Sequence, residues 1–292
     1  MPVFIAKHIT KFLLLMLAVS LVVFVLVSAS PIDPVQANVG TAAYINMSAE
    51  KRAQLAEYWG ADKPVWERYV SWAGAIVQGD MGMSLRYNAP VADVIGARFL
   101  NSLALMTVAW LVSGLLGFAL GIVAGVYRGR PVDRLIKGYC YLLASTPAFW
   151  LGLVVLMIFS VWLGWFPFGF SVPIGVAESE VTFADAAHHL ILPALTLSVI
   201  GVANVALHTR EKTIDVLEST YFRFARSRGL GVWTAMRTSG LRNLLLPAIT
   251  LQFASISEIF GGSVLVEQVF SYPGLGQAAV RAGLGGDVAL LA

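Results

Sequence analysis

Residues 138–177 read GYCYLLASTPAFWLGLVVLMIFSVWLGWFPFGFSVPIGVA and contain no Asp, Glu, Lys or Arg. A helix rises about 1.5 Å per residue, so a bilayer core of ~30 Å needs ~20 apolar residues. The charge-free run is 40 residues long, which is more than one membrane span requires. Within it, Ser145-Thr146-Pro147 predicts a kink in the helix, because proline removes a backbone hydrogen bond.

Other runs of the right length lie on both sides of this one and give five expected spans in an all-α integral membrane protein. They are residues 12–26, 99–127, 190–207 and 243–270, the last interrupted only by Glu258 and Glu267. The closing residues, 288–292, look like the first turn of a sixth span that is truncated after Ala292.

The composition of all 292 residues agrees with this class: 58% are hydrophobic and 13% are charged. A soluble domain has roughly 45–50% apolar and about 25% charged residues. Disorder and collagen are excluded, and a water-soluble enzyme is disfavoured. The single cysteine, Cys140, excludes an internal disulfide and a Cys-rich metal site.

The first run also resembles a signal peptide, because Lys7 and Lys11 precede it and residues 28–30 could form a cleavage site. Pro31 follows that site directly and argues against cleavage, so we expect a retained helix. We divide the chain into an N-terminal tail and first span (1–30), an extracytoplasmic helical loop (31–98) and a core that holds the remaining spans (99–292). The loop is expected to pack on the span ends; a docking surface for an external partner is the alternative.

The distribution of charge predicts the orientation. The segments before the first span, between the second and third, and between the fourth and fifth are rich in Lys and Arg. The loop between the third and fourth spans holds Glu178, Glu180 and Asp185 and no Lys or Arg. The positive-inside rule therefore places the N-terminus in the cytoplasm.

Motifs for catalysis are missing from the sequence. The dipeptide Gly-Lys does not occur, so there is no Walker A loop, and neither HExxH nor G-x-S-x-G is found. The adjacent pair His188-His189 is more typical of a membrane interface than of a metal site, because neighbouring helical side chains diverge by about 100°. We expect no metal and no catalytic residue, and a protein that acts as a path or a lever.

The inner segment 209–243 is the most informative part of the chain, since it holds seven of the basic residues. Charge alone indicates only a solvated cytoplasmic face. Tyr221, Phe222 and Phe224, interleaved with Arg223 and Arg226, further predict a short helix lying in a groove of a cytoplasmic partner. Gly229 would then allow a sharp turn.

This segment resembles the cytoplasmic loop of ABC importer permeases, whose signature is Glu-Ala-Ala, three residues, Gly and a later hydrophobic-Leu-Pro. Ala225 and Gly229 match, whereas Arg223 and Phe224 replace the Glu and first Ala, and Pro247 lies 18 residues after Gly229. These departures are typical of the oligopeptide/dipeptide/nickel branch. Four further stretches resemble that branch: residues 78–84 (QGDMGMS), 145–150 (STPAFW), 189–193 (HLILP) and 261–276, with VEQVFSYPGLG at its end.

The resemblance implies a type I ABC importer transmembrane domain in a bacterial or archaeal plasma membrane. The expected partners are a second homologous permease subunit, two cytoplasmic ATPase subunits that hold ATP and Mg²⁺, an extracytoplasmic binding protein and the lipid bilayer; nucleic acid is not expected. It carries the role of coupling helix to residues 221–228, ending at Gly229. The family has six spans.

Glu258 lies 11 residues past Pro247, roughly 16 Å along a helix, which is near the middle of the membrane. A carboxylate there costs about 2.5–3.5 kcal/mol, so it should face a wet cavity or a partner. Attraction of a cationic group in the pathway and a bond to the partner subunit are equally favoured. The candidate pathway residues are Ser145, Pro147, Phe149, Trp150, Asn204, Glu258, Gly261 and Gly262. The pair Gly261-Gly262 permits a close helix approach or a bend, and both this pair and the stretch at Pro147 are more often packing devices than ligand contacts.

The resemblance admits di- and oligopeptides, nickel and metal chelates as substrates. Peptides are favoured narrowly, because the spans lack a cluster of metal ligands. A self-contained channel or secondary transporter is a more distant alternative, since the spans show little polar surface. A purely structural membrane anchor is a third.

Overall fold

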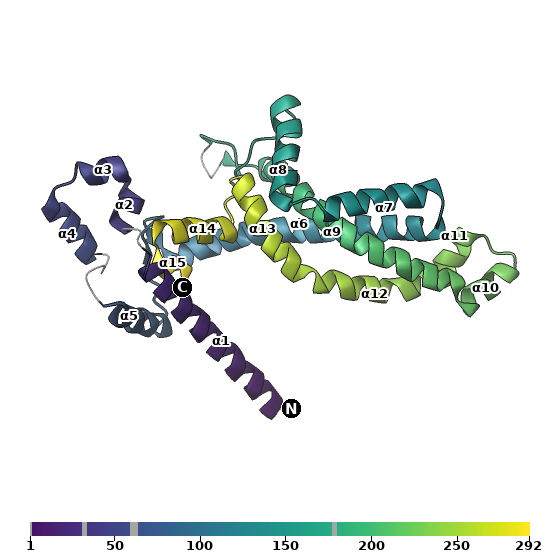
Figure 1. Cartoon of the computed structure of the whole chain (residues 1–292), viewed down its shortest axis with the longest axis horizontal. Helices are drawn as coiled ribbons and strands as arrows, with labels where there is room; N and C mark the ends of the chain where they lie inside the picture. The colour runs from purple at the N-terminus through teal and green to yellow at the C-terminus, as the bar shows by residue number, and fades with distance from the viewer. Residues whose placement is uncertain (1, 31–33, 59–63, 177–179) are drawn as a thin grey trace. The chain divides into compact units, whose positions relative to one another are not determined.

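The computed structural model describes residues 2–30, 34–58, 64–176 and 180–292. Two residues that bear on the sequence predictions lie outside these ranges. They are Pro31, which argues against cleavage of the first helix, and Glu178, one of the acidic residues that support the orientation. The described chain is mostly helical (Figure 1). It divides into two compact units. Unit 1 comprises residues 1–100 and 277–292, and unit 2 comprises residues 101–276.

Unit 1 begins with the long apolar helix α1 (Pro2–Ser28) and continues with the helices of the first loop. These are α2 (Pro34–Val39), α3 (Thr41–Ile45), α4 (Ala49–Tyr58) and α5 (Val65–Val77). Helix α5 packs on α1, where the rings of Phe24 and Tyr69 meet edge to face at 5.3 Å and the Tyr69 hydroxyl lies 3.0 Å from Ser20 Oγ. This contact supports the expectation that the loop packs on a span end.

A short hairpin, β1 (Met83–Ser84) paired with β2 (Ala89–Pro90), precedes α6 (Val91–Val126) in the chain. The buried Asp287, which caps α15 (Val288–Leu291), accepts hydrogen bonds from Ser84 Oγ at 2.6 Å and from the Arg86 backbone N at 3.1 Å. The structure thus joins the end of the 78–84 motif to the last residues of the chain.

Unit 2 contains most of α6 and a series of further helices, ending where α14 (Leu275–Gly285) begins. The series is α7 (Pro131–Ala144), α8 (Ala148–Leu156), the wider turn η1 (Met157–Trp162), α9 (Phe183–Glu218), α10 (Thr220–Ser227), α11 (Val232–Ala235), η3 (Met236–Gly240), α12 (Leu241–Ala254) and α13 (Ile256–Val269). One hydrophobic core centres on Leu105, Leu192, Val266 and Phe270, which come from α6, α9 and the end of α13.

Helices α6 and α9 approach closely along a row of glycines on α6. A Cβ atom added at Gly117, Gly121 or Gly125 would lie only 2.7, 2.5 and 2.5 Å from the Cβ atoms of three α9 residues. Those residues are Val205, Thr209 and Thr213. Small residues allow such close packing between membrane helices, where apolar lipid removes much of the hydrophobic driving force.

Two helices can cross a membrane by length and composition, Phe4–Ser28 and Val91–Val126, and three bent pairs raise the number of candidate spans in the described chain to five. This agrees with the five expected spans. The third span is not a kinked helix, however: α7 and α8 meet at 105°. A second break, of 47°, separates α12 from α13 at Ser255, and α13 runs through Gly261-Gly262, so of the two possibilities for this glycine pair the structure shows no bend there.

Candidate coupling site and membrane residues

Helix α10 occupies the position where residues 221–228 predict a short helix. The N-cap residue Ser219 has an extended backbone, and its Oγ accepts a hydrogen bond from Phe222 N at 3.4 Å, so the chain turns sharply after α9. At the other end Gly229 has a φ of +83°, a conformation that side-chain-bearing residues rarely adopt. Both ends of the helix are therefore specified locally.

The two faces of α10 differ in exposure. Phe222 and Ala225 are buried, at 3% and 7% exposure, whereas Tyr221 and Phe224 are 42% and 64% exposed. Arg223 and Arg226 are also exposed, although Arg226 donates a hydrogen bond to the Leu230 carbonyl at 2.6 Å. The outer face thus combines aromatic rings with guanidinium groups, which is the composition of energetically important residues in protein interfaces.

The buried face of α10 belongs to a hydrophobic cluster that draws on α6, α9, α11, η3 and α12. The buried members are Phe222 and Ala225 of α10 together with Ile122, Val216, Ala235, Met236 and Leu244. Figure 1 shows α10 and α11 together beside the end of α9. A force applied to the outer face of α10 would therefore reach several membrane helices through packed side chains.

Sequence reasoning missed a buried ion pair near this site. The Asp133 carboxylate on α7 receives Arg210 Nε at 2.6 Å and Arg210 Nη2 at 3.0 Å. The two side chains are 0% and 10% exposed. Removing one partner of a buried pair costs about 3–5 kcal/mol, because the other charge is left without compensation. The only signal for this pair in the sequence was Asp133 itself, an acidic residue in the first turn of the helix that begins at Pro131.

A second ion pair joins the same region of the chain to the end of α9, but at the surface. Arg128 Nη1 lies 2.6 Å from Glu218 Oε1, and the side chains are 58% and 67% exposed. Exposed pairs contribute only about 0–1 kcal/mol. The two pairs therefore connect neighbouring segments with very different strengths.

Among the expected pathway residues, the structure brings Asn204 and Glu258 together. Asn204 Nδ2 donates to Glu258 Oε2 at 3.4 Å, which links α9 to α13, and Glu258 is exposed. The exposed carboxylate agrees with either of its two interpretations, a pathway group or a contact of the partner subunit.

The other expected pathway residues lie on separate elements. Ser145 and Pro147 are exposed in the break between α7 and α8, and Phe149 and Trp150 at the start of α8 are 47% and 53% exposed. On α13 Gly261 faces open space, whereas a Cβ on Gly262 would lie 3.2 Å from Leu197 Cδ1. Gly262 is therefore a packing position.

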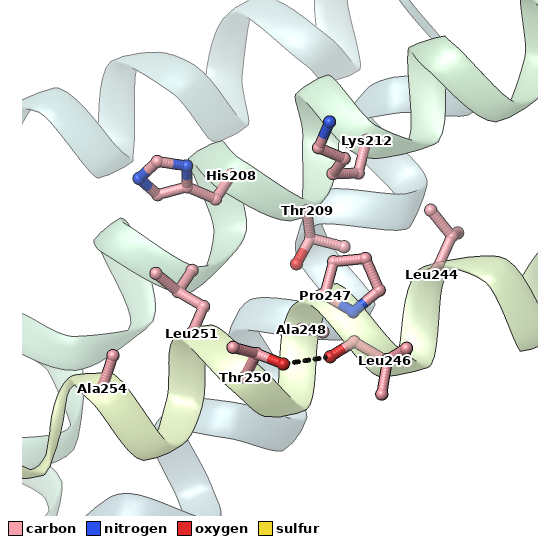
Figure 2. Close-up of a pocket in the computed structure, with 10 residues that line it drawn as sticks. All are labelled: His208, Thr209, Lys212, Leu244, Leu246, Pro247, Ala248, Thr250, Leu251 and Ala254. Atoms are coloured by element: carbon pink, nitrogen blue, oxygen red, sulfur yellow. Dashed lines mark hydrogen bonds between the residues drawn. The ribbon is translucent and has the colours of Figure 1, made fainter.

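A groove of about 510 Å³ lies between α9 and α12 (Figure 2). His208 and Lys212 stand on its α9 side, one and two turns beyond Asn204, and Leu251 and Pro247 are among the residues on its α12 side. The remaining lining residues are Thr209, Leu244, Leu246, Ala248, Thr250 and Ala254. The groove is mostly apolar, so it is suited to packing or to a ligand with apolar side chains.

The adjacent histidines His188 and His189 each contact a backbone carbonyl oxygen. His188 and His189 contact the backbone carbonyls of Trp165 and Gly169, at 3.0 and 2.7 Å. Within the described ranges no group of three His, Cys, Asp or Glu side chains could hold a metal ion.

The fully buried Glu267 receives Ser102 Oγ at 2.7 Å. It fills space left by two glycines: Cβ atoms on Gly274 and Gly276 would lie 2.3 and 2.9 Å from its carboxylate atoms. The Glu and the Gly-x-Gly of the last motif thus form one packed turn.

Comparison with known proteins gives two family matches that together include nearly all of the chain. Residues 117–292 match the family described as binding-protein-dependent transport system inner membrane component, and residues 1–109 match its N-terminal family. The oligopeptide transport system permease protein AppB of Bacillus subtilis is 35% identical over 267 residues, which are 91% of this chain and 82% of the relative. The glutathione transport system permease protein GsiC of Escherichia coli K12 is 36% identical over 262 residues, 90% of this chain and 80% of the relative.

Proposed function

Because the chain belongs to the family of binding-protein-dependent transport inner membrane components, and is a multi-pass permease subunit of an ABC importer, we propose that α10 is its coupling helix. The observation that carries this proposal is the difference between the two faces of α10. Phe222 and Ala225 fix the helix to the membrane core, while Tyr221, Arg223 and Phe224 remain available to a partner.

The partner of the outer face is proposed to be a cytoplasmic ATPase subunit. This chain would form one half of the membrane pathway and a homologous permease the other, in a bacterial or archaeal plasma membrane. Two ATPase subunits would bind ATP and Mg²⁺, and an external binding protein would deliver the substrate. Closure of the ATPase pair would move α10 and switch the pathway between its outward and inward openings.

The proposed substrates are di- and oligopeptides. The support comes from the relatives, which are named as permeases for oligopeptides and for glutathione, and from Glu258, whose carboxylate would attract a peptide ammonium group. Nickel is not favoured by these relatives. We also propose that the chain is organised in three parts, residues 1–30, 31–98 and 99–292. Ser145, Phe149 and Trp150 are proposed to line the pathway.

Co-purification tests the role of α10. The tagged chain, expressed together with candidate ABC ATPase subunits from the same organism, should retain them on an affinity column. Arg223→Glu combined with Arg226→Glu should release them, because the exposed positive charges of α10 are reversed. Arg237→Glu, the reversal of one exposed arginine outside α10, should not. Equal retention by the double variant would show that the ATPase docks elsewhere.

A further inference from the structure

We propose that the Asp133–Arg210 pair is a fixed joint that makes α7 follow α9 when α10 moves, and that the break between α7 and α8 is the hinge that absorbs this movement. The proposal rests on the proposed function, because it assigns positioning residues to the coupling of ATP hydrolysis to transport. Neither residue needs to touch the substrate or the ATPase.

Several contacts hold the side chains of Asp133 and Arg210 in place. Arg210 approaches both carboxylate oxygens of Asp133, at 2.6 Å through Nε and at 3.0 Å through Nη2, which fixes the orientation of the two side chains as well as their distance. The Gly129 backbone N also donates to Asp133 Oδ2 at 2.8 Å, and Lys137 Nζ lies 3.8 Å from the same atom. Arg210 additionally pairs with the exposed Glu211.

Burial keeps this joint closed. Asp133 is 0% exposed and the Arg210 side chain 10%, so water cannot readily replace a lost contact. When α9 moves, separation of the pair is therefore less favourable than movement of both helices together.

The joint is close to the proposed point of force. Arg210 precedes the end of α9 at Glu218 by eight residues, roughly 12 Å along the helix, and α10 begins two residues later at Thr220. Val216, near that end of α9, packs in the same cluster as Phe222 of α10. Movement of α10 thus acts on the α9 segment that carries Arg210.

The far end of α7 has the geometry of a hinge. Residues 145–147 separate α7 from α8, the two helices meet at 105°, and Pro147 has no N–H to continue the helical bonds. Ser145 and Pro147 at the break itself are exposed, whereas Leu143 of α7 and Leu151 of α8 on its two sides pack against the same cluster on α9, so a change of angle would have to shift α8 against that cluster. Hinges are typically a few residues at the ends of elements.

The exposed pair Arg128–Glu218 provides a matched control. It joins the turn before α7 to α9, at 2.6 Å, but its side chains are 58% and 67% exposed. Solvent and salt can replace such a contact. If burial is what makes the Asp133–Arg210 pair hold α7 to α9, neutralising Asp133 should impair the coupling of ATP hydrolysis to transport, whereas neutralising Arg128 should not.

The first test measures substrate transported per ATP hydrolysed by the complete complex in proteoliposomes. Asp133→Asn should lower this ratio by about two- to thirtyfold, the range of known coupling changes. Arg210→Lys, which keeps the charge but loses the two-point contact, should lower it less, and Arg128→Gln should leave it unchanged. An unchanged ratio in Asp133→Asn, with uptake and ATPase activity falling together, would mean that the pair is merely structural and would overturn the joint.

The second test measures motion directly. In a Cys140→Ala background, spin labels at Leu135→Cys and Lys212→Cys report the distance between α7 and α9, and labels at Leu135→Cys and Leu153→Cys report the distance across the break. The Leu135 and Leu153 side chains are exposed, as is that of Lys212. Between nucleotide-free and ATP-trapped complexes the first distance should stay constant and the second should change. A change in the first distance as large as in the second would contradict the proposal.

Different results would contradict the proposed function and the proposed joint. A wild-type complex without ATP-dependent uptake would remove the proposed function itself. A wild-type complex that transports, together with a constant ratio in Asp133→Asn, would remove only the joint.

Discussion

Phe222 and Phe224 are two positions apart on α10 and have opposite surroundings. Phe222 is 3% exposed in the cluster that fixes the helix, and Phe224 is 64% exposed. The sequence shows that both residues are phenylalanine. It does not show which of them anchors the helix and which is available to a partner, because that depends on how α6, α9 and α12 pack against α10.

Replacement of the two rings should therefore separate stability from coupling. Phe222→Ala should destabilise the subunit by about 3–5 kcal/mol, because it leaves a cavity in a packed cluster. Phe224→Ala should change stability by less than about 0.5 kcal/mol and should reduce substrate-stimulated ATPase activity. Thermal unfolding of the purified complex and ATPase assays measure the two effects. The reverse pattern would mean that α10 presents its other face to the partner.

Glu258 is the residue on which the substrate interpretation depends. Glu258→Gln keeps the hydrogen bond to Asn204 within reach but removes the charge, so the KM for peptides with a free ammonium group should rise relative to that for N-acetylated peptides. Ser257→Ala, a change of the adjacent exposed residue, serves as the control. Equal KM values for free and N-acetylated peptides in wild type and Glu258→Gln alike would assign Glu258 to the subunit interface instead.

At the scale of elements, the sequence predicted the apolar helices well and their breaks poorly. Length and absence of charge are local properties, so runs such as 99–127 and 12–26 correspond to α6 and α1. The angle at residues 145–147 depends on what α8 packs against, and proline alone does not distinguish a kink from a 105° break. In the same way, no proline or glycine lies at Ser255 to mark the 47° bend there in the sequence.

The close contact of α6 with α9 depends on the absence of side chains. A Cβ on Gly121 would lie 2.5 Å from Thr209 Cβ and 2.6 Å from the Ala206 carbonyl oxygen, whereas a Cβ on Gly138 of α7 has nothing within 4 Å. Gly121→Ala should therefore cost about 1–3 kcal/mol through overpacking.

The control Gly138→Ala should be neutral or stabilising, because alanine favours helices by about 1 kcal/mol over glycine. Chemical denaturation in detergent micelles checks both variants. Equal stability of Gly121→Ala and wild type would mean that α6 and α9 can separate without loss.

At the scale of the whole molecule, the proposed functional residues all lie in unit 2. Unit 2 holds α10, the ion pair Asp133–Arg210 and the Asn204–Glu258 contact, and therefore carries the proposed coupling and pathway roles. Unit 1 holds α1 with the packed loop helix α5, and the Asp287 contacts that join its hairpin to the end of the chain. The candidate site could be located from the sequence because arginines and aromatic residues coincide there. The ion pair that supports it could not, since residues 133 and 210 are brought together only by folding.

An ATP-driven importer is distinguished from an ion-coupled transporter by the uptake of a labelled peptide into proteoliposomes that contain the complete complex, energised by ATP alone, by an ion gradient alone or by neither. The account predicts uptake with ATP alone, its loss when the ATPase subunits are omitted, and its loss in the variant carrying Arg223→Glu and Arg226→Glu. Uptake driven by an ion gradient without ATP, or wild-type ATP-driven uptake by the double variant, would contradict it.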